Sequence, residues 1–256
     1  MTRVILLALA GMLMLSSGAM GAPVKTETVH FKSGEETIDG YLAVPDSAGR
    51  HPALVVIHEW WGLNDDIKAI TRRLAGEGYV ALAVDLYGGA TAGTPDKAQE
   101  LRSAVLDDPL RAQRNLSQAY DYLEKYALAP RIGSIGWDLG GGQSLQTALQ
   151  FPDSLDAMVM YYGQVVDDRE QLAKLKMPML GFFGSEDKSI PVRDVQAFRA
   201  TLSDLKKNAE ILIMVGNDHD FANPTSRTYD ERAATEAWSK TLQFLARNLK
   251  APAATR

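Results

Sequence analysis

The feature that most constrains this chain is a group of glycines between a strand-like segment and a helix-like one. Residues 132–136 form a short apolar run that ends in Gly136, and residues 143–149 are compatible with a helix. Asp138 lies two residues after Gly136 and two residues before Gly140. This is the spacing of a tight strand-to-helix turn whose flanking positions have no room for a Cβ and whose central side chain is a nucleophile. The residue expected at the centre is Ser or Cys, whereas this chain has Asp.

Two other interpretations of the glycines are weaker. A phosphate-binding loop would need G-x-x-x-x-G-K-[ST] or G-x-G-x-x-G, and neither spacing is present here. A plain strand–helix turn, with glycines that only allow close packing, stays possible from this segment alone. The rest of the chain has to distinguish it from a catalytic turn.

The size and charge of the chain exclude several classes of function. A length of 256 residues fits one α/β domain. A net charge of −5 argues against a nucleic-acid partner, because no basic surface is available to bind phosphates. The chain has no cysteine, which excludes disulfides, thiolate catalysis and cysteine-ligated metals. We expect neither a cofactor nor a metal.

The first residues have the pattern of a secretory signal. Arg3 gives a positive start, residues 4–15 are almost wholly apolar, and Ala-Met-Gly at 19–21 offers a cleavage signal before Ala22. The apolar core is shorter than the ~20 residues that span a bilayer. We therefore predict a signal peptide over residues 1–21 and an exported, periplasmic domain over residues 22–256, with no membrane span after cleavage.

Strand-like and helix-like segments alternate along the rest of the chain. The expected strands are 26–32, 37–44, 52–58, 79–86, 132–136, 157–163, 179–184 and 209–215, and the expected helices are 64–76, one or two within 95–126, 143–149, 192–205 and 232–249. This alternation predicts a parallel sheet covered on both faces. Functional groups in such sheets lie beyond the carboxyl ends of the strands.

Four polar residues follow the ends of predicted strands: Glu59, Asp138, Asp187 and His219. Each of them is a weak signal alone. Together, Asp138, Asp187 and His219 have the chain order of nucleophile, acid and histidine that α/β-hydrolases use. We therefore expect these side chains to meet in one site.

With these residues in view, the sequence resembles the dienelactone hydrolase family over nearly the whole chain after the signal. The matching segments are His-Glu-Trp-Trp-Gly-Leu-Asn at 58–64, Asp-Leu-Tyr at 85–87, Gly-Trp-Asp-Leu-Gly-Gly at 136–141, Gly-Ser-Glu-Asp at 184–187 and Asp-His-Asp-Phe-Ala-Asn at 218–223. The resemblance implies a single-domain α/β-hydrolase fold, with about eight mainly parallel strands and helices on both faces.

The resemblance also implies roles for individual residues. Glu59 matches the glutamate that the family keeps beside its nucleophile, and Asp187 and His219 match the other two members of the triad. The backbone N–H groups of Trp60 and Leu139 match the oxyanion hole.

The chain departs from the family pattern in two places. The nucleophilic cysteine is replaced by Asp138, and no arginine occurs in the two regions that hold the substrate carboxylate in the founding lactonases, here 88–90 and 221–224. An anionic substrate would therefore lose its hydration without gaining a charged partner. We expect a small neutral substrate, and a monomeric protein.

An aspartate at this position suits alkyl transfer better than acyl transfer. Attack on an ester would give a mixed anhydride, whereas attack on an alkyl halide or an epoxide gives an ordinary alkyl-enzyme ester. His219, oriented by Asp187, could then activate water to hydrolyse that ester. Glu59 beside Asp138 would make two carboxyl groups share a proton, which weakens Asp138 as a nucleophile or gives Glu59 the role of an acid.

Two functions stay open from the sequence. The first is an exported hydrolase that acts on a small neutral ester, lactone, alkyl halide or epoxide through Asp138, Asp187 and His219. The second is an inactive family member, in which the loss of the cysteine leaves a periplasmic binding or scaffold protein. An introduced substitution at position 138 would also explain the aspartate.

Overall fold

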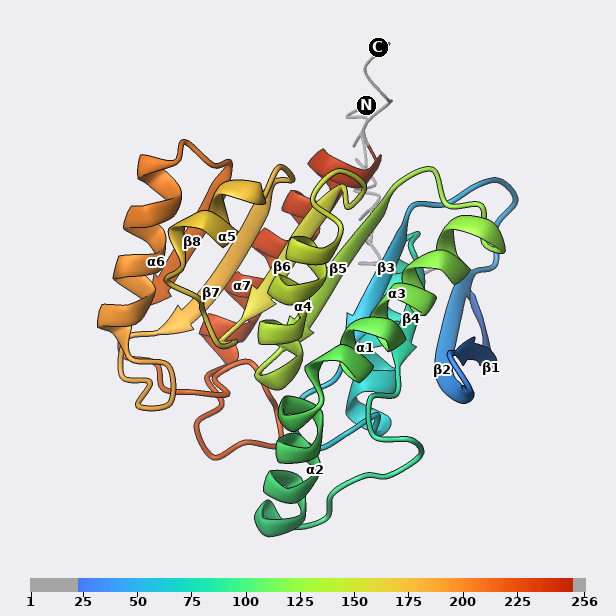
Figure 1. Ribbon diagram of the computed structural model, residues 1–256, viewed down its shortest axis with the longest axis horizontal. Helices are drawn as coiled ribbons and strands as arrows, with labels where there is room; N and C mark the ends of the chain where they lie inside the picture. Colours follow the sequence, from blue (N-terminus) through green and yellow to red (C-terminus); the bar gives the residue numbers. More distant parts are fainter. Residues whose placement is uncertain (1–22, 251–256) are drawn as a thin grey trace, which may run out of the picture.

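The computed structural model describes residues 23–250 as one eight-stranded sheet flanked by helices (Figure 1). The predicted signal peptide, residues 1–21, lies outside the described residues. The strands are β1 (Val24–Ser33), β2 (Glu36–Pro45), β3 (Ala53–Ile57), β4 (Val80–Val84), β5 (Ile132–Trp137), β6 (Ala157–Tyr161), β7 (Met179–Gly184) and β8 (Ala209–Met214).

The sheet has the strand order β1-β2-β4-β3-β5-β6-β7-β8. The β1–β2 and β2–β4 pairs are antiparallel, and all pairs from β4 to β8 are parallel. The prediction of an α/β fold with about eight mainly parallel strands is confirmed. The parallel strands place their carboxyl ends along one edge, where α2 lies in Figure 1.

Helices cover both faces of this sheet. They are α1 (Asp65–Gly76), α2 (Pro95–Asp107), α3 (Pro109–Lys125), α4 (Leu139–Gln150), α5 (Arg169–Lys174), α6 (Val192–Asp204) and α7 (Glu231–Leu245), followed by the π-helical turn η1 (Ala246–Lys250). Apolar residues of α1 and α7 pack with one face of the sheet, and those of α3 to α6 pack with the other.

The helix ends follow from local chemistry. Asn64 caps α1 at the start of the predicted helix 64–76, since its side-chain oxygen accepts the Ile67 N–H at 3.1 Å. Asp108 divides the segment 95–126 into two helices, because it ends α2 and its side chain caps α3, which begins with Pro109. Two details were not predicted: α4 begins at Leu139, so that its glycines lie inside the helix, and α5 is a separate short helix.

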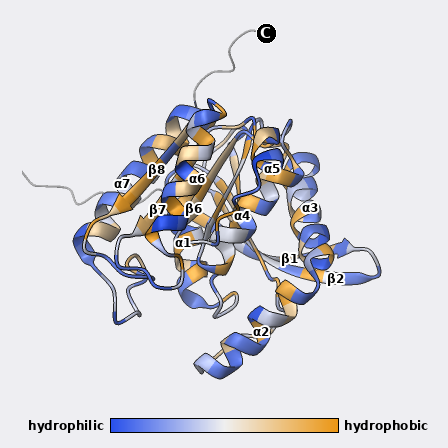
Figure 2. Ribbon diagram, turned by 60° about the vertical axis from the view of Figure 1, so that its left-hand side comes forward, coloured by the Kyte–Doolittle hydropathy of each residue, from blue (hydrophilic) through white to orange (hydrophobic). Residues whose placement is uncertain are grey.

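The central strands read as continuous apolar runs because both of their faces are buried. In β3, Ala53, Val55 and Ile57 belong to one core cluster, and Leu54 and Val56 belong to the other. Each of the larger side chains, Val, Leu and Ile, contributes about 1.5–3 kcal/mol when fully buried. Figure 2 shows the result, with hydrophobic strands at the centre and hydrophilic residues on the outer faces of the helices. No helix within residues 23–250 is long and apolar enough to cross a membrane.

The turn from β5 to α4 depends on close backbone contacts. A Cβ on Gly136 would overlap the carbonyl oxygen of Gly140, and a Cβ on Gly140 would overlap the carbonyl oxygen of Ile57 at the end of β3. Backbone atoms cannot move aside as flexible side chains can. The two glycines therefore bring α4 directly onto the ends of β3 and β5.

We predict that Gly140→Ala lowers the free energy of unfolding by about 3 kcal/mol or more, at the upper end for overpacking a core. Gly142→Ala is the matched control in the same helix, because a Cβ there would meet its nearest neighbour, Gln164, at 3.4 Å. That change should leave stability equal or raise it by up to about 1 kcal/mol, since alanine favours helix more than glycine does. Denaturant unfolding of both variants is the measurement, and equal stabilities would contradict the prediction.

Candidate functional site

Asp138 lies at the turn between β5 and α4 in a strained backbone conformation, with φ of 48° and ψ of −113°. A positive φ is uncommon for a residue with a side chain and costs of order 1–3 kcal/mol. The Asp138 N–H donates to the carbonyl of Tyr161 at 3.1 Å, which ties the turn to the neighbouring strand β6. The side chain is thereby held at the carboxyl edge of the sheet.

The carboxylate of Asp138 has a different partner on each oxygen. Oδ2 accepts a hydrogen bond from the backbone N–H of Trp60 at 3.2 Å. Oδ1 lies 3.2 Å from Nε2 of His219. The structure therefore brings Asp138 together with the predicted histidine and with one of the two predicted oxyanion donors.

His219 is held on its other side by Asp187. Its Nδ1 lies 2.7 Å from Oδ2 of Asp187, whose other oxygen accepts the backbone N–H groups of Ser189 and Ile190 at 2.7 and 2.9 Å. The Asp187 side chain is fully buried, so its position is set by these bonds. The three residues predicted from chain order thus form one continuous hydrogen-bonded row.

The negative groups around His219 keep its ring protonated. Burial lowers the pKa of the imidazole, but the hydrogen bonds to Asp138 and Asp187 and the charge of Asp220 outweigh it and raise the pKa to about 10. At neutral pH both ring nitrogens therefore carry a proton, and Nδ1 donates to Asp187 while Nε2 donates to Asp138.

Glu59 is buried beside this row, with its oxygens turned to two neutral partners. Oε1 accepts the Tyr162 hydroxyl at 3.1 Å, and Oε2 accepts the side-chain amide of Asn223 at 2.6 Å. Burial, and then the charges of Asp220 and Asp138, raise the pKa of Glu59 to about 8. With this raised pKa, Glu59 carries a proton at neutral pH.

The segment with Glu59 and Trp60 is anchored by buried hydrogen bonds. The Leu86 N–H donates to Nε2 of His58 at 3.1 Å, so His58 uses its Nδ1–H to donate to the carbonyl of Glu59 at 2.6 Å. The Tyr87 hydroxyl donates to the carbonyl of Trp60 at 3.0 Å. These bonds fix the peptide whose N–H contacts Asp138.

The second predicted oxyanion donor, the N–H of Leu139, differs from that of Trp60 in its relation to the Asp138 carboxylate. Leu139 is buried at the first position of α4, next to Asp138. Within residues 23–250, no hydrogen bond is recorded from its N–H to the carboxylate of Asp138, so Trp60 alone provides that contact in this structure.

A cavity of about 220 Å³ opens beside Asp138. Its lining consists of Arg102, Leu106, Asp138, Leu139, Gly142, Gln143, Gln146, Gln164, Val166 and Ile190. Arg102, from α2, forms no hydrogen bond or ion pair with any other residue among those described. The regions 88–90 and 221–224 have no arginine, but α2 brings a cation to the cavity from elsewhere in the chain.

Sequence reasoning missed four residues of the site. Asp220 and Asn223 lie within the matched segment 218–223 beside His219, and Tyr162 directly follows β6, so these positions could have indicated them. No local signal indicated Arg102, because it lies in a helix and not at the end of a strand.

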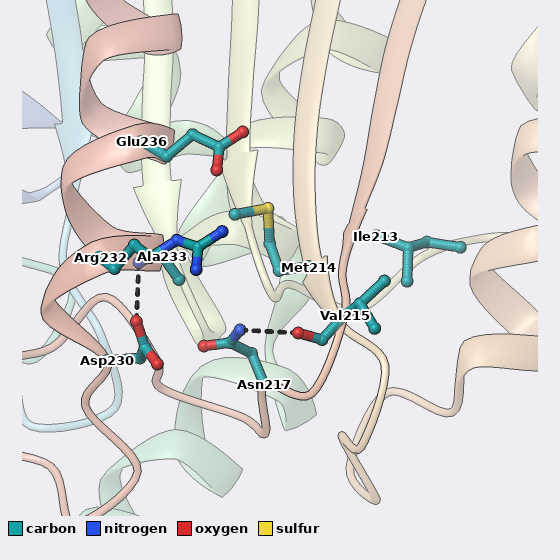
Figure 3. Close-up of a pocket in the computed structure, with 8 residues that line it drawn as sticks. All are labelled: Ile213, Met214, Val215, Asn217, Asp230, Arg232, Ala233 and Glu236. Atoms are coloured by element: carbon teal, nitrogen blue, oxygen red, sulfur yellow. Dashed lines mark hydrogen bonds between the residues drawn. The ribbon is translucent and has the colours of Figure 1, made fainter.

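A second cavity, of about 320 Å³, lies between the end of β8 and the start of α7 (Figure 3). Its polar bonds stabilise local turns: Asn217 donates to the Val215 carbonyl, and Asp230 accepts the Ala233 N–H. None of the predicted site residues lines it. The part of the chain that the structure describes also holds no cluster of three or more His, Asp or Glu residues able to bind a metal.

We predict that Glu59→Gln changes the pH dependence of stability. The pKa of Glu59 is raised from 4.5 in the unfolded chain to about 8 in the folded protein, so its stabilising effect is full below pH 4.5 and is lost as the pH rises to about 8. Glutamine resembles the protonated acid, and its amide can donate to the Tyr162 hydroxyl in place of the bond that it receives.

The wild type should therefore lose more stability than the variant between pH 4.5 and 8. Denaturant unfolding of both proteins across this range is the measurement. Parallel stability curves would show that Glu59 ionises as easily in the folded state as in the unfolded one.

Comparison with known proteins agrees with this architecture. The dienelactone hydrolase family matches residues 38–249. A "Putative carboxymethylenebutenolidase" of Saccharolobus solfataricus is 32% identical over 257 residues, covering 86% of this chain and 97% of its own. "Protein usf" of Aquifex pyrophilus is 29% identical over 225 residues, covering 85% of this chain and 96% of its own.

Solved structures show the same fold. A crystal structure described as a "Putative Dienelactone Hydrolase" from Klebsiella pneumoniae has a TM-score of 0.77 and 27% identity, covering 88% of this chain and 99% of that one. The family match begins within β2 and extends over β3 to β8, the turn at Asp138 and the segments with Asp187 and His219. The chain belongs to the dienelactone hydrolase family.

Proposed function

We propose that the protein is a hydrolase that uses Asp138 as a nucleophile on a small neutral alkyl electrophile, an alkyl halide or an epoxide. One observation carries the proposal: Oδ2 of Asp138 is bound by the Trp60 N–H while Oδ1 faces His219. The oxyanion donor is thus directed at the carboxylate of the protein itself. It is ready to stabilise charge on that oxygen when water attacks an alkyl ester of Asp138.

The same contact disfavours acyl transfer. The carbonyl oxygen of an ester substrate would need the N–H of Trp60, which Asp138 already occupies. A mixed anhydride would also lie far above the ester in free energy. A neutral ester or lactone is the second candidate, and the names given to the relatives from Saccharolobus solfataricus and Klebsiella pneumoniae support hydrolysis of a lactone.

The other predicted residues take supporting roles in this proposal. His219, held by Asp187, moves protons during hydrolysis of the alkyl-enzyme ester. Protonated Glu59 lowers the negative charge next to Asp138, the proposed nucleophile. Arg102 lines the cavity, and its positive charge would stabilise the negative charge that forms on the leaving group.

We predict that a bromoalkane or an epoxide alkylates Asp138. His219→Ala should slow the second step, so that the intact protein gains the mass of the alkyl group and the modified peptide includes Asp138. After one turnover of the wild type in oxygen-18 water, the Asp138 carboxylate should hold the label, because water attacks its carbonyl carbon. Asp138→Asn should form no adduct.

Asp138→Cys separates the two candidate substrates. This variant should hydrolyse an activated phenyl ester faster than the wild type does, because it restores a thiol nucleophile. The absence of both label and adduct, with a Cys variant active on esters, would favour the inactive alternative for the natural chain.

We further predict that a neutral substrate is turned over with a kcat/KM about 10-fold or more above that of its carboxylated analogue, which corresponds to about 1.4 kcal/mol. The carboxylates of Asp138 and Asp220 repel an anion at the point of attack. Styrene oxide and its ring-carboxylated derivative form a suitable pair. Arg102→Gln tests the opposite result: if the wild type prefers the anion and this variant does not, Arg102 binds a substrate carboxylate.

A further inference from the structure

Asp220 lies in the loop after β8 in an unusual environment. Its φ of 59° is in the left-handed region, which Asp tolerates better than most residues but which still costs free energy. Its Oδ1 is buried and has no hydrogen-bond partner among the described residues. Buried carboxylate oxygens are normally hydrogen-bonded, so this oxygen is free to receive a bond from another molecule.

The free oxygen faces the reacting side of the histidine. Oδ1 of Asp220 lies 3.5 Å from Nε2 of His219, which also lies 3.2 Å from Oδ1 of Asp138. The single proton on Nε2 can make only one good hydrogen bond, and the shorter distance assigns it to Asp138. Asp220 is therefore a second proton acceptor beside the same two reacting groups.

His219 is poorly suited to take a proton from water. It already donates from both nitrogens, to Asp187 and to Asp138, and its ring is protonated at neutral pH. Alkylation of Asp138 removes one neighbouring negative charge, but Asp187 and Asp220 still stabilise the imidazolium. Hydrolysis of the alkyl ester therefore needs another base.

We propose that Asp220 is the base that takes a proton from the hydrolytic water, while protonated His219 acts as the acid. This inference rests on the proposed function of Asp138. The water oxygen bonds to Cγ of Asp138, and one water proton passes to Oδ1 of Asp220. The charge that forms on the carboxyl oxygen of Asp138 is stabilised by the Trp60 N–H.

The intermediate then breaks the bond between Cγ and the alkyl oxygen, and the alcohol leaves with the Nε2 proton of His219. Asp138, released as a carboxylic acid, returns a proton to Nε2. With an alkyl halide, the proton on Asp220 goes to solvent and balances the released halide. With an epoxide, the ring-opened oxygen has already taken a proton from the site, and the proton on Asp220 replaces that one.

The surroundings of Asp220 suit a base that works near neutral pH. Burial raises its pKa, protonated His219 lowers it, and the charges of Asp138, Asp187 and Asp218 raise it, with a result of about 6. Glu59 and Tyr162 also face it, and both have raised pKa values and are neutral at pH 7. Asp220 is thus ionised at neutral pH and becomes protonated in mild acid.

The test is Asp220→Asn, because asparagine tolerates a positive φ and has the same shape but is not a base. In single-turnover experiments with a bromoalkane, alkylation of Asp138 should keep its rate, whereas hydrolysis of the adduct should slow by about 100-fold or more. The wild-type hydrolysis step should also decline below about pH 6, as Asp220 becomes protonated, and the variant should lose this decline.

Asp218→Asn is the matched control, since it removes the same charge from a neighbouring residue whose side chain accepts the backbone N–H of His219 and does not face Nε2. It should not accumulate the adduct. An adduct that Asp220→Asn hydrolyses at the wild-type rate would overturn the role of Asp220 and leave Asp138 as the nucleophile. An absence of adduct in the wild type and in His219→Ala would overturn the proposed function, and this inference with it.

Discussion

The position of Asp138 depends on how closely three pieces of backbone approach at the start of α4. Gly140 lies against the carbonyl oxygen of Ile57, so the end of β3 and the first turn of α4 are in direct contact. This contact places the backbone N–H of Trp60, which follows β3, within hydrogen-bond distance of the Asp138 carboxylate. A longer or looser turn would separate the carboxylate from the only backbone donor recorded for it among the described residues.

The electrostatics of the site follow from this convergence. One imidazolium, His219, faces Asp138, Asp187 and Asp220, and Glu59 is buried close by. Four ionised carboxyl groups around one cation would repel each other strongly in a buried space. Burial and the charges of Asp220 and Asp138 limit this repulsion, because they raise the pKa of Glu59 enough that it keeps its proton, although the hydrogen bonds from Tyr162 and Asn223 favour its ionised form. Three negative charges then remain around one positive charge.

The sequence was sufficient for the fold because the signals for its elements are local. Apolar runs such as 53–57 and 179–184 end in polar residues, and the cap at Asn64 marks the start of a helix. The row of Asp138, His219 and Asp187 could be predicted for the same reason, since each of these residues follows a strand. The role of Arg102 could not be predicted, because this residue reaches the cavity only through the path of α2 past the sheet edge. The free oxygen of Asp220 likewise depends on a backbone angle that no residue pattern specifies.

The attachment of α2 has an evolutionary consequence. Only Ala98 and Val105 of this helix are buried, while Arg102 and Leu106 line the cavity beside Asp138. Residues that form the wall of the cavity can therefore change at little cost to the hydrophobic core, because they do not pack within it. Selection can alter the shape and charge of the cavity through α2 while the turn at Asp138 and the sheet beneath it stay constant. New substrate preferences are thus open to this chain by surface mutation alone.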